Sequence, residues 1–152
     1  MSLWKYVLPC IALTVVACGK SAQNPQELGR LVANAHVEGN YGIIEDLLAS
    51  SLEVESVFGS SAEISVGPKD KMDRTQLVIY RDSPKAWFDF TLKKWRPLGI
   101  SLGNVEIAAQ TDKLAIIAAG LKTKDPDRPN NSVFIIIYAY RVERGWVVIY
   151  MI

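Results

Sequence analysis

The chain has 152 residues, enough for one domain with a substantial core. Lys plus Arg number 17 and Asp plus Glu 16, so the formal net charge is +1 and the basic excess of a nucleic-acid-binding protein is absent. Two cysteines and one histidine are too few for a disulfide framework or a His-rich metal centre. We therefore expect one globular domain with no metal, no cofactor and no nucleic-acid partner.

Residues 1–17 have the pattern of a lipoprotein signal peptide. Lys5 makes the start positive, and an apolar run follows that is shorter than the roughly 20 residues of a spanning helix. The run ends in Val-Val-Ala-Cys-Gly at positions 15–19, which resembles the lipobox of bacterial lipoproteins. An ordinary signal peptide, or an apolar first helix with a chance cysteine, is the alternative.

The lipobox predicts that Cys18 carries a lipid, that residues 18–24 tether it, and that one domain spans residues 25–152. Several acyl chains together hold a protein on a bilayer, so the membrane is an expected partner. Cys10 leaves with the signal, and the domain then has no free thiol. Gly19, rather than Asp, favours the periplasmic face of the outer membrane in a Gram-negative host. We expect a lipid-anchored protein of the cell envelope.

Two helices are predicted at the start of the domain. Asn24, Pro25 and Glu27 form a helix start with a capping residue, a proline at the first position and an acid at the third. This helix ends near residues 39–40, and Asn40 caps a second, shorter one. The apolar residues at helical spacing are Leu28, Leu31, Val32, Ala35, Ile43, Ile44, Leu47 and Leu48.

The middle of the chain is mixed. Residues 52–58 predict a strand, residues 59–73 a loop, and residues 75–80 a short strand. Residues 83–97 fit a helix by one spacing and a strand by the alternation of residues 88, 90 and 92. We favour the helix because Ser83-Pro84 starts it and Pro97 stops it. Its apolar face carries Trp87, Phe88, Leu92 and Trp95.

The last third predicts four strands, at residues 100–110, 113–124, 132–143 and 146–152. Short connections make them an antiparallel meander. The fold class is α+β, with N-terminal helices packed on a curved antiparallel sheet. Along residues 132–143 both faces are apolar, so both should be covered, one by the chain's own helices and the other by a partner.

The order of these elements resembles the nuclear transport factor 2-like superfamily, in particular its SnoaL-like branch. Residues 35–48 resemble that family's opening of helix, Gly-Asn, helix and Leu-Leu. Residues 103–107, 112–116, 138–142 and 145–148 are similar to its closing meander, in which a Gly-Trp pair starts the final strand. The resemblance covers most of residues 25–152.

The resemblance implies a cone-shaped, cystatin-like sheet with a pocket at its open end, and a homodimer through the outer sheet face. Relatives include isomerases, cyclases and dehydratases with an Asp/His or Asp/Tyr set inside the cone, and noncatalytic binding modules. His36, the one histidine, is interpreted as a surface or half-buried residue, because Glu38 points to another side of the helix. Glu45 and Asp46 are interpreted as solvated.

Six residues are candidates to line the pocket, five of them aromatic. A carboxylate among aromatic rings would have a raised pKa, which keeps Asp89 a candidate acid. Core filling is the alternative role for the rings. Lys93, Lys94, Arg141 and Arg144 are interpreted as solvated charges. The pocket candidates are Tyr80, Trp87, Asp89, Trp95, Tyr138 and Tyr140.

The function predicted from these features is noncatalytic binding of a small apolar ligand or an envelope protein. One alternative is a small SnoaL-like isomerase or cyclase that uses a pocket carboxylate. Another is a structural subunit of an envelope assembly whose working surface is the sheet face.

Overall fold

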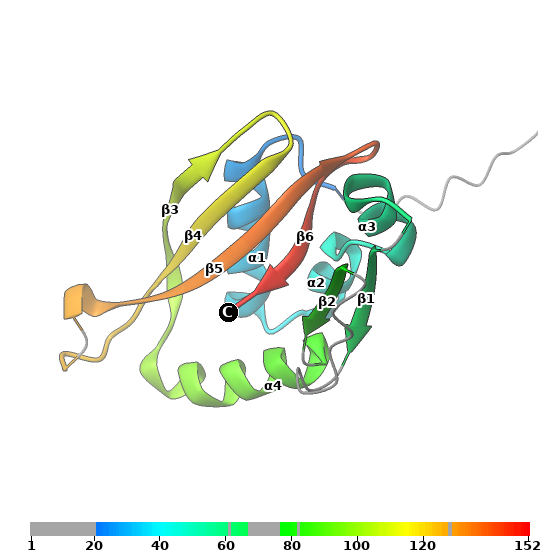
Figure 1. The fold of residues 1–152 in the computed structure, drawn as a ribbon. Coiled ribbons are helices and arrows are strands. Elements are labelled where there is room, and N and C mark those ends of the chain that lie inside the picture. The colour runs from blue at the N-terminus through cyan, green and yellow to red at the C-terminus, as the bar shows by residue number, and fades with distance from the viewer. Residues whose placement is uncertain (1–20, 61, 67–76, 82, 128) are drawn as a thin grey trace, which may run out of the picture.

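The computed structural model describes residues 21–60, 62–66, 77–81, 83–127 and 129–152. It is an α+β structure, as predicted, with four α-helices and six strands in this part of the chain (Figure 1). The elements are α1 (Pro25–Glu38), α2 (Tyr41–Leu47), α3 (Ser51–Phe58), β1 (Ala62–Val66), β2 (Leu77–Arg81), α4 (Pro84–Trp95), η2 (Arg96–Leu98), β3 (Ser101–Gln110), β4 (Leu114–Lys122), η3 (Pro129–Asn131), β5 (Ser132–Val142) and β6 (Gly145–Met151).

The first two helices begin and end where the local signals predict. The Asn24 side chain accepts a hydrogen bond from the Glu27 amide at 2.8 Å, and Pro25 takes the first helical position of α1. Gly39 ends the helix with a φ of 68°, a left-handed conformation that suits glycine. Asn40 then caps α2 by accepting from the Gly42 amide.

The strand predicted at residues 52–58 is wrong, because this segment is helix α3. Ser50 and Glu53 form a capping box, in which each side chain accepts from the other residue's backbone amide. The two amides that a helix start leaves without partners are thereby satisfied. In the helix, Val54 is buried and Leu52 is 78% exposed, so only one side of this apolar run faces the core.

The predicted loop at residues 59–73 contains strand β1, which sequence reasoning missed. It pairs in parallel with β2, from Ala62 opposite Leu77 to Val66 opposite Arg81. The strand predicted at residues 75–80 corresponds to β2. Residues 67–76 lie outside the described residues.

The predicted antiparallel meander is confirmed. Strands β3, β4, β5 and β6 lie side by side in chain order (Figure 1). The ladder has register shifts between Leu102 and Val105 and between Ile107 and Ala109 in β3, and after Tyr138 in β5. Such bulges bend a strand and increase its twist.

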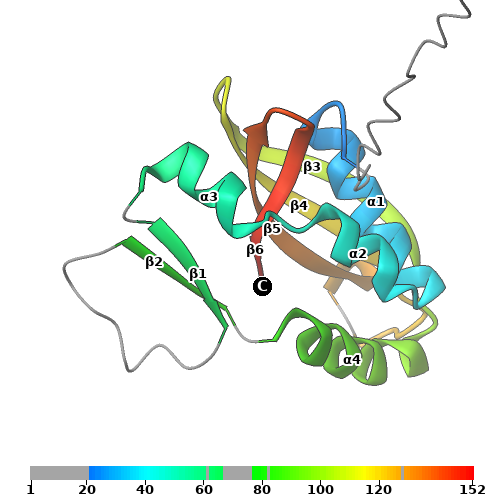
Figure 2. The same cartoon turned by 90° about the vertical axis from the view of Figure 1, so that its right-hand side faces the viewer.

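One face of this sheet packs on α1, and the core lies between them (Figure 2). In α1, Gly29 allows the close approach, since a Cβ atom there would lie 2.5 Å from Val105 Cγ1 and 2.9 Å from Ile117 Cγ2. The fully buried sheet residues of this core include Ala115, Ile117, Ala119, Leu121, Ile135, Ile137 and Ala139.

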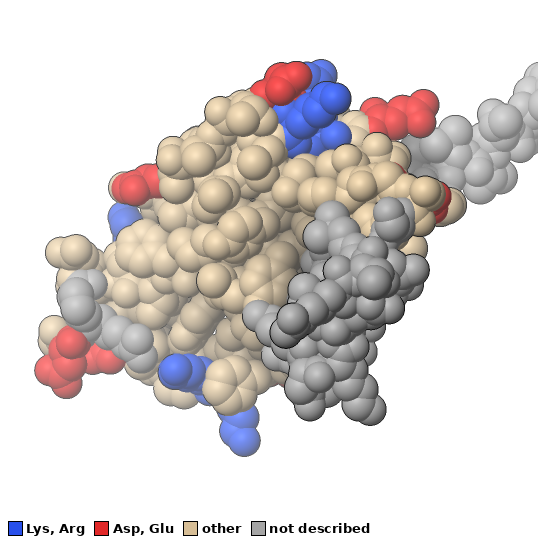
Figure 3. Space-filling model, in the orientation of Figure 1, with Lys and Arg blue, Asp and Glu red and all other residues tan. Residues whose placement is uncertain are grey.

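At one end, the outer face of the sheet is covered by elements of the same chain. There α3 and β1 pack over Val147 and Ile149 of β6, with the Phe58 ring 4.7 Å from the Tyr140 ring. Further along, the face is open to solvent. Figure 3 shows charged groups at the margins of this face and an uncharged middle.

Helix α4 confirms the helical reading of residues 83–97. Ser83 accepts from the Ala86 amide as its cap, and Pro84 follows at the first position. The helix runs across one end of the sheet, below the C-terminal end of β6 in Figure 2. Its buried side chains are Phe88, Thr91, Leu92 and Trp95.

Candidate functional site

A cavity of about 170 Å³ lies between the start of α4 and the end of β6. Trp87 and Pro84 of α4 form one wall, and Leu48, which follows α2, forms another. The end of the last strand supplies the remaining side. The described lining residues are Leu48, Pro84, Trp87, Ile149, Tyr150, Met151 and Ile152.

The side chains of the lining are apolar apart from the Tyr150 hydroxyl, and no charged side chain occurs among these described residues. A dry cavity of about 150 Å³ lined by aliphatic and aromatic groups holds a benzene-sized molecule. The present cavity is of that order, so it matches one ring or a short stretch of alkyl chain. Without a side-chain acid or base at the ligand's position, the chemistry it offers is apolar contact rather than proton transfer.

His36 is fully buried, which corrects the surface or half-buried position predicted from the sequence. Its ring contacts Trp87, at 5.6 Å between centroids, together with Phe88 and Trp95. Its Nδ1–H donates to the Val32 carbonyl at 2.8 Å, while Nε2 has no partner among the described residues. Burial lowers the pKa of His36 to about 4, against the smaller raising effect of the Val32 hydrogen bond.

The predicted pocket residues are distributed over several environments. Trp87 lines the cavity, and Trp95 fills the core beside His36. Tyr138 lies on the outer sheet face with its ring 6.0 Å from Tyr150, and Tyr140 packs against Phe58. Burial raises the pKa of Tyr140. The side chain of Tyr80, in β2, lies outside the described residues.

Asp89 does not line the cavity. Its side chain is 55% exposed on α4 and forms an ion pair with Lys85, one turn earlier, at 2.5 Å. The helical period that buries Phe88 and Leu92 turns position 89 towards solvent, so the aromatic neighbours along the chain do not surround it. Asp46 is also exposed, as predicted.

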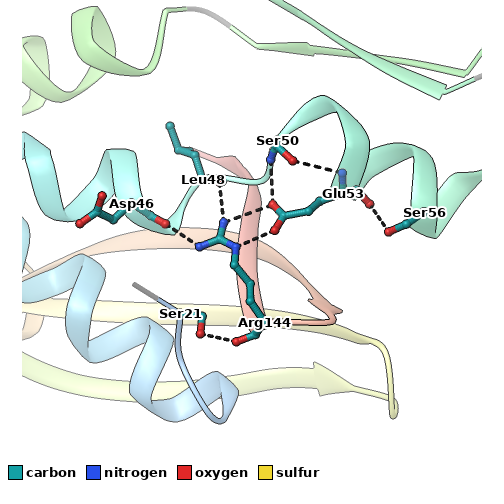
Figure 4. Close-up of polar contacts among 7 residues, drawn as sticks. All are labelled: Ser21, Asp46, Leu48, Ser50, Glu53, Ser56 and Arg144. Atoms are coloured by element: carbon teal, nitrogen blue, oxygen red, sulfur yellow. Dashed lines mark hydrogen bonds and ion pairs between the residues drawn. The ribbon is translucent and has the colours of Figure 1, made fainter. Parts of the chain in front are cut away.

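Arg144 was predicted to be a solvated charge, which is wrong, because its guanidinium is hydrogen-bonded to other groups of the chain (Figure 4). Its Nε donates to Glu53 Oε1 at 2.6 Å, and its Nη2 to Glu53 Oε2 at 3.2 Å. The same guanidinium donates to the backbone carbonyls of Asp46 and Leu48, at 2.8 and 3.0 Å. Because Leu48 is a cavity wall, Arg144 helps to hold the cavity in shape.

This ion pair changes the titration of Glu53. Burial raises the pKa of the carboxyl, but the hydrogen bonds from Arg144 and Ser50 and the Arg144 charge outweigh it, so the pKa lies below its usual value. The carbonyl of Arg144 also accepts from the Ser21 hydroxyl, which ties the start of the described chain to the β5–β6 turn.

The cavity residues Leu48, Ile149, Met151 and Ile152 were not among the candidates. Only the apolar character of the last strand pointed to Ile149, Met151 and Ile152, and Leu48 was identified only as part of a helical apolar face. Cys18 and the predicted signal peptide lie outside the described residues. Within the described part of the chain, no helix is both long and apolar enough to cross a bilayer. The described residues also contain no group of three His, Cys, Asp or Glu that could hold a metal ion.

Comparison of the chain with protein-family models, with curated proteins and with solved structures finds no match.

Proposed function

We propose that this chain is a lipid-anchored protein of the cell envelope whose domain binds a small apolar ligand without catalysing a reaction. The observation that carries the proposal is the cavity between Trp87 and the end of β6, because its described lining offers apolar contact and no charged side chain. The lipobox around Cys18 supports the anchoring, and outer-membrane sorting follows from Gly19 in a Gram-negative host.

We further propose that the domain is a nuclear transport factor 2-like cone. Supporting features are the two opening helices, the α1 helix packed on one face of a bulged meander, and a cavity between a helix and the last strand. The enzyme alternative has less support, because Asp89 is paired with Lys85 on the surface and His36 has no acidic partner among the described residues.

The test is native mass spectrometry of the full chain, made in a bacterial host and released from mild detergent. We expect a noncovalent apolar adduct that dissociates on collisional activation, while the covalent anchor stays. Trp87→Ala should lose the adduct. Phe90→Ala, on the exposed side of the same helix, should keep it. The proposal would be refuted by a protein that carries no adduct and whose tryptophan fluorescence does not change when octanoate is added.

A second candidate function is docking of a protein through the open part of the outer sheet face. Ile116, Ala118, Ile136 and Tyr138 lie there on paired positions of β4 and β5, all partly exposed. An uncharged face of this kind is typical of an interaction site. A homodimer in the same spectra that Ile136→Lys converts to monomer would support it, and a concentration-independent monomer would refute self-association.

A further inference from the structure

A second depression, separate from the apolar cavity, lies on the outer sheet face beside the β4–β5 connection. Its volume is about 560 Å³, within the range of ligand sites. It shares no described residue with the apolar cavity. Its lining residues are Gly103, Asn104, Glu106, Gly120, Lys122, Thr123, Asn130, Asn131, Ser132 and Phe134.

Two glycines form the floor of this groove. The register shift in β3 brings Gly103 against β4, where a Cβ atom would lie 2.8 Å from the Gly120 carbonyl oxygen. A Cβ atom on Gly120 would lie 2.7 Å from the Asn104 carbonyl oxygen and 3.3 Å from the Phe134 ring. A side chain at either position would displace backbone. Gly103 is partly exposed, whereas Gly120 is buried with the Phe134 ring close to it.

One wall of the groove is an exposed aromatic ring. Phe134 stands opposite Gly120 in the β4–β5 ladder and is 51% exposed, although its neighbours Val133 and Ile135 are buried. A ring in this position presents a flat apolar surface over a backbone floor.

The rest of the rim is polar and balanced in charge. Asn104, Asn130 and Asn131 are exposed amides, each with donors and an acceptor. Glu106 and Lys122 add one charge of each sign. Among the described residues, no hydrogen bond or ion pair engages the side chains of Asn104, Asn131, Glu106 or Lys122, so these groups are free to meet a ligand.

Thr123, which also lines the groove, has an unused hydrogen-bonding group. The residue is 7% exposed, and its Oγ1 has no partner among the described residues. Its amide is occupied, donating to the Asn131 carbonyl at 2.6 Å. The Oγ1 atom has almost no accessible surface, so this hydroxyl does not take part in the polar rim of the groove.

We propose that this groove binds a saccharide. A pyranose has an apolar C–H face, which suits the Phe134 ring, and a rim of hydroxyls that both donate and accept, which suits the exposed amides. The opposite charges of Glu106 and Lys122 cancel, so the groove favours a neutral ligand over an anion or a cation. The volume accommodates a disaccharide.

The test is saturation-transfer-difference NMR on the full chain in mild detergent, with glucose, N-acetylglucosamine, cellobiose and N,N′-diacetylchitobiose as probes. We expect saturation of the C–H protons on one face of a pyranose ring at millimolar ligand. Phe134→Ala should weaken binding about tenfold, equivalent to about 1.4 kcal/mol. Phe90→Ala removes an exposed ring elsewhere, 63% exposed against 51% for Phe134, and should have no effect.

A second variant distinguishes the loss of a ligand contact from a loss of folding. Asn104→Ala lies at an exposed position and should weaken binding while leaving the circular dichroism spectrum unchanged. The proposal is overturned if none of the four sugars receives saturation, or if Phe134→Ala binds them like the natural chain. It is equally overturned if Phe134→Ala dissociates a dimer that binds no sugar, because the ring would then belong to a protein interface. Immobilised peptidoglycan and free disaccharide, compared in a pull-down, distinguish a polymeric from a soluble source.

Discussion

Arg144 and Glu53 join the β5–β6 turn to the first turn of α3 through two nearly parallel hydrogen bonds, Nε to Oε1 at 2.6 Å and Nη2 to Oε2 at 3.2 Å. The two residues are 91 positions apart in the sequence. Since the guanidinium also holds the carbonyls of Asp46 and Leu48, one side chain connects the end of α2, the start of α3 and the last hairpin. Lysine cannot replace these bonds, because it lacks the planar guanidinium group that donates several of them at once.

Replacing Arg144 with Met should therefore destabilise the domain by about 2–4 kcal/mol, because Glu53 and two carbonyls lose charge-assisted partners. Urea unfolding followed by circular dichroism measures the change. Arg141→Met is the matched control, since the Arg141 residue near the end of β5 is exposed, and it should change stability by less than about 0.5 kcal/mol. Equal effects of the two substitutions would contradict the role of Arg144.

His36 should make the stability depend on pH. Its pKa is lowered from 6.5 to about 4 in the folded protein, so between these values the unfolded chain binds more protons. The stability is complete above the unfolded value and falls as the pH is lowered through this window. Between about pH 7 and about pH 5 the loss should be about 2 kcal/mol.

His36→Phe tests this prediction, because it keeps a buried ring and removes the titration and the unpartnered Nε2. Thermal melts at several pH values should show a flatter profile above pH 5 for the variant. The lowered pKa of Glu53 acts below its unfolded value of 4.5, where folded-state stability is lost as that carboxylate is protonated, so it does not obscure the His36 window. An unchanged slope in His36→Phe would refute the assignment.

Gly29 should be intolerant of alanine. Alanine favours a helix by about 1 kcal/mol over glycine, but its methyl would meet Val105 and Ile117, and overpacking costs about 1–3 kcal/mol. We expect net destabilisation in chemical unfolding. In the exposed first turn of α2, a Cβ atom on Gly42 would meet only the Asn40 Oδ1, at 3.2 Å, so Gly42→Ala should change stability by no more than about 1 kcal/mol and should not destabilise as Gly29→Ala does. A stabilised Gly29→Ala would show that α1 can move off the sheet without cost.

The anchor is testable through the two cysteines. Cys18→Ser should abolish labelling of the chain with an alkyne-bearing fatty acid in a bacterial host and leave the signal segment uncleaved in the intact mass. Cys10→Ser lies inside the signal and should keep both the label and the cleavage. Labelling that survives Cys18→Ser would rule out Cys18 as the lipidated residue.

The parts of the fold that were predicted correctly depend on neighbours in the chain. The α1 start requires only Asn24, Pro25 and Glu27, and the meander requires only alternating apolar runs with short turns. Segment 52–58 shows where this reasoning fails. Its β-prone composition favoured a strand, although the Ser50 and Glu53 caps for a helix were present in the sequence and were missed.

The candidate site was harder to predict because it is assembled from distant segments. Trp87 was identified from its ring, but Leu48 and Met151 became lining residues only when the end of β6 met the start of α4. Asp89 was a candidate because of its aromatic neighbours, and the helix phase turned it to solvent instead.

The sequence by itself determined the caps, the helices α1, α2 and α4, the order of the four long strands and the lipobox pattern, because each depends on residues a few positions apart. Only the tertiary structure decided that His36 is buried, that Arg144 binds Glu53, and that α3 and β1 cover one end of the outer sheet face. These outcomes depend on which apolar surfaces are buried against one another. Burial brings together segments that are far apart in the sequence, so local sequence patterns do not reveal it.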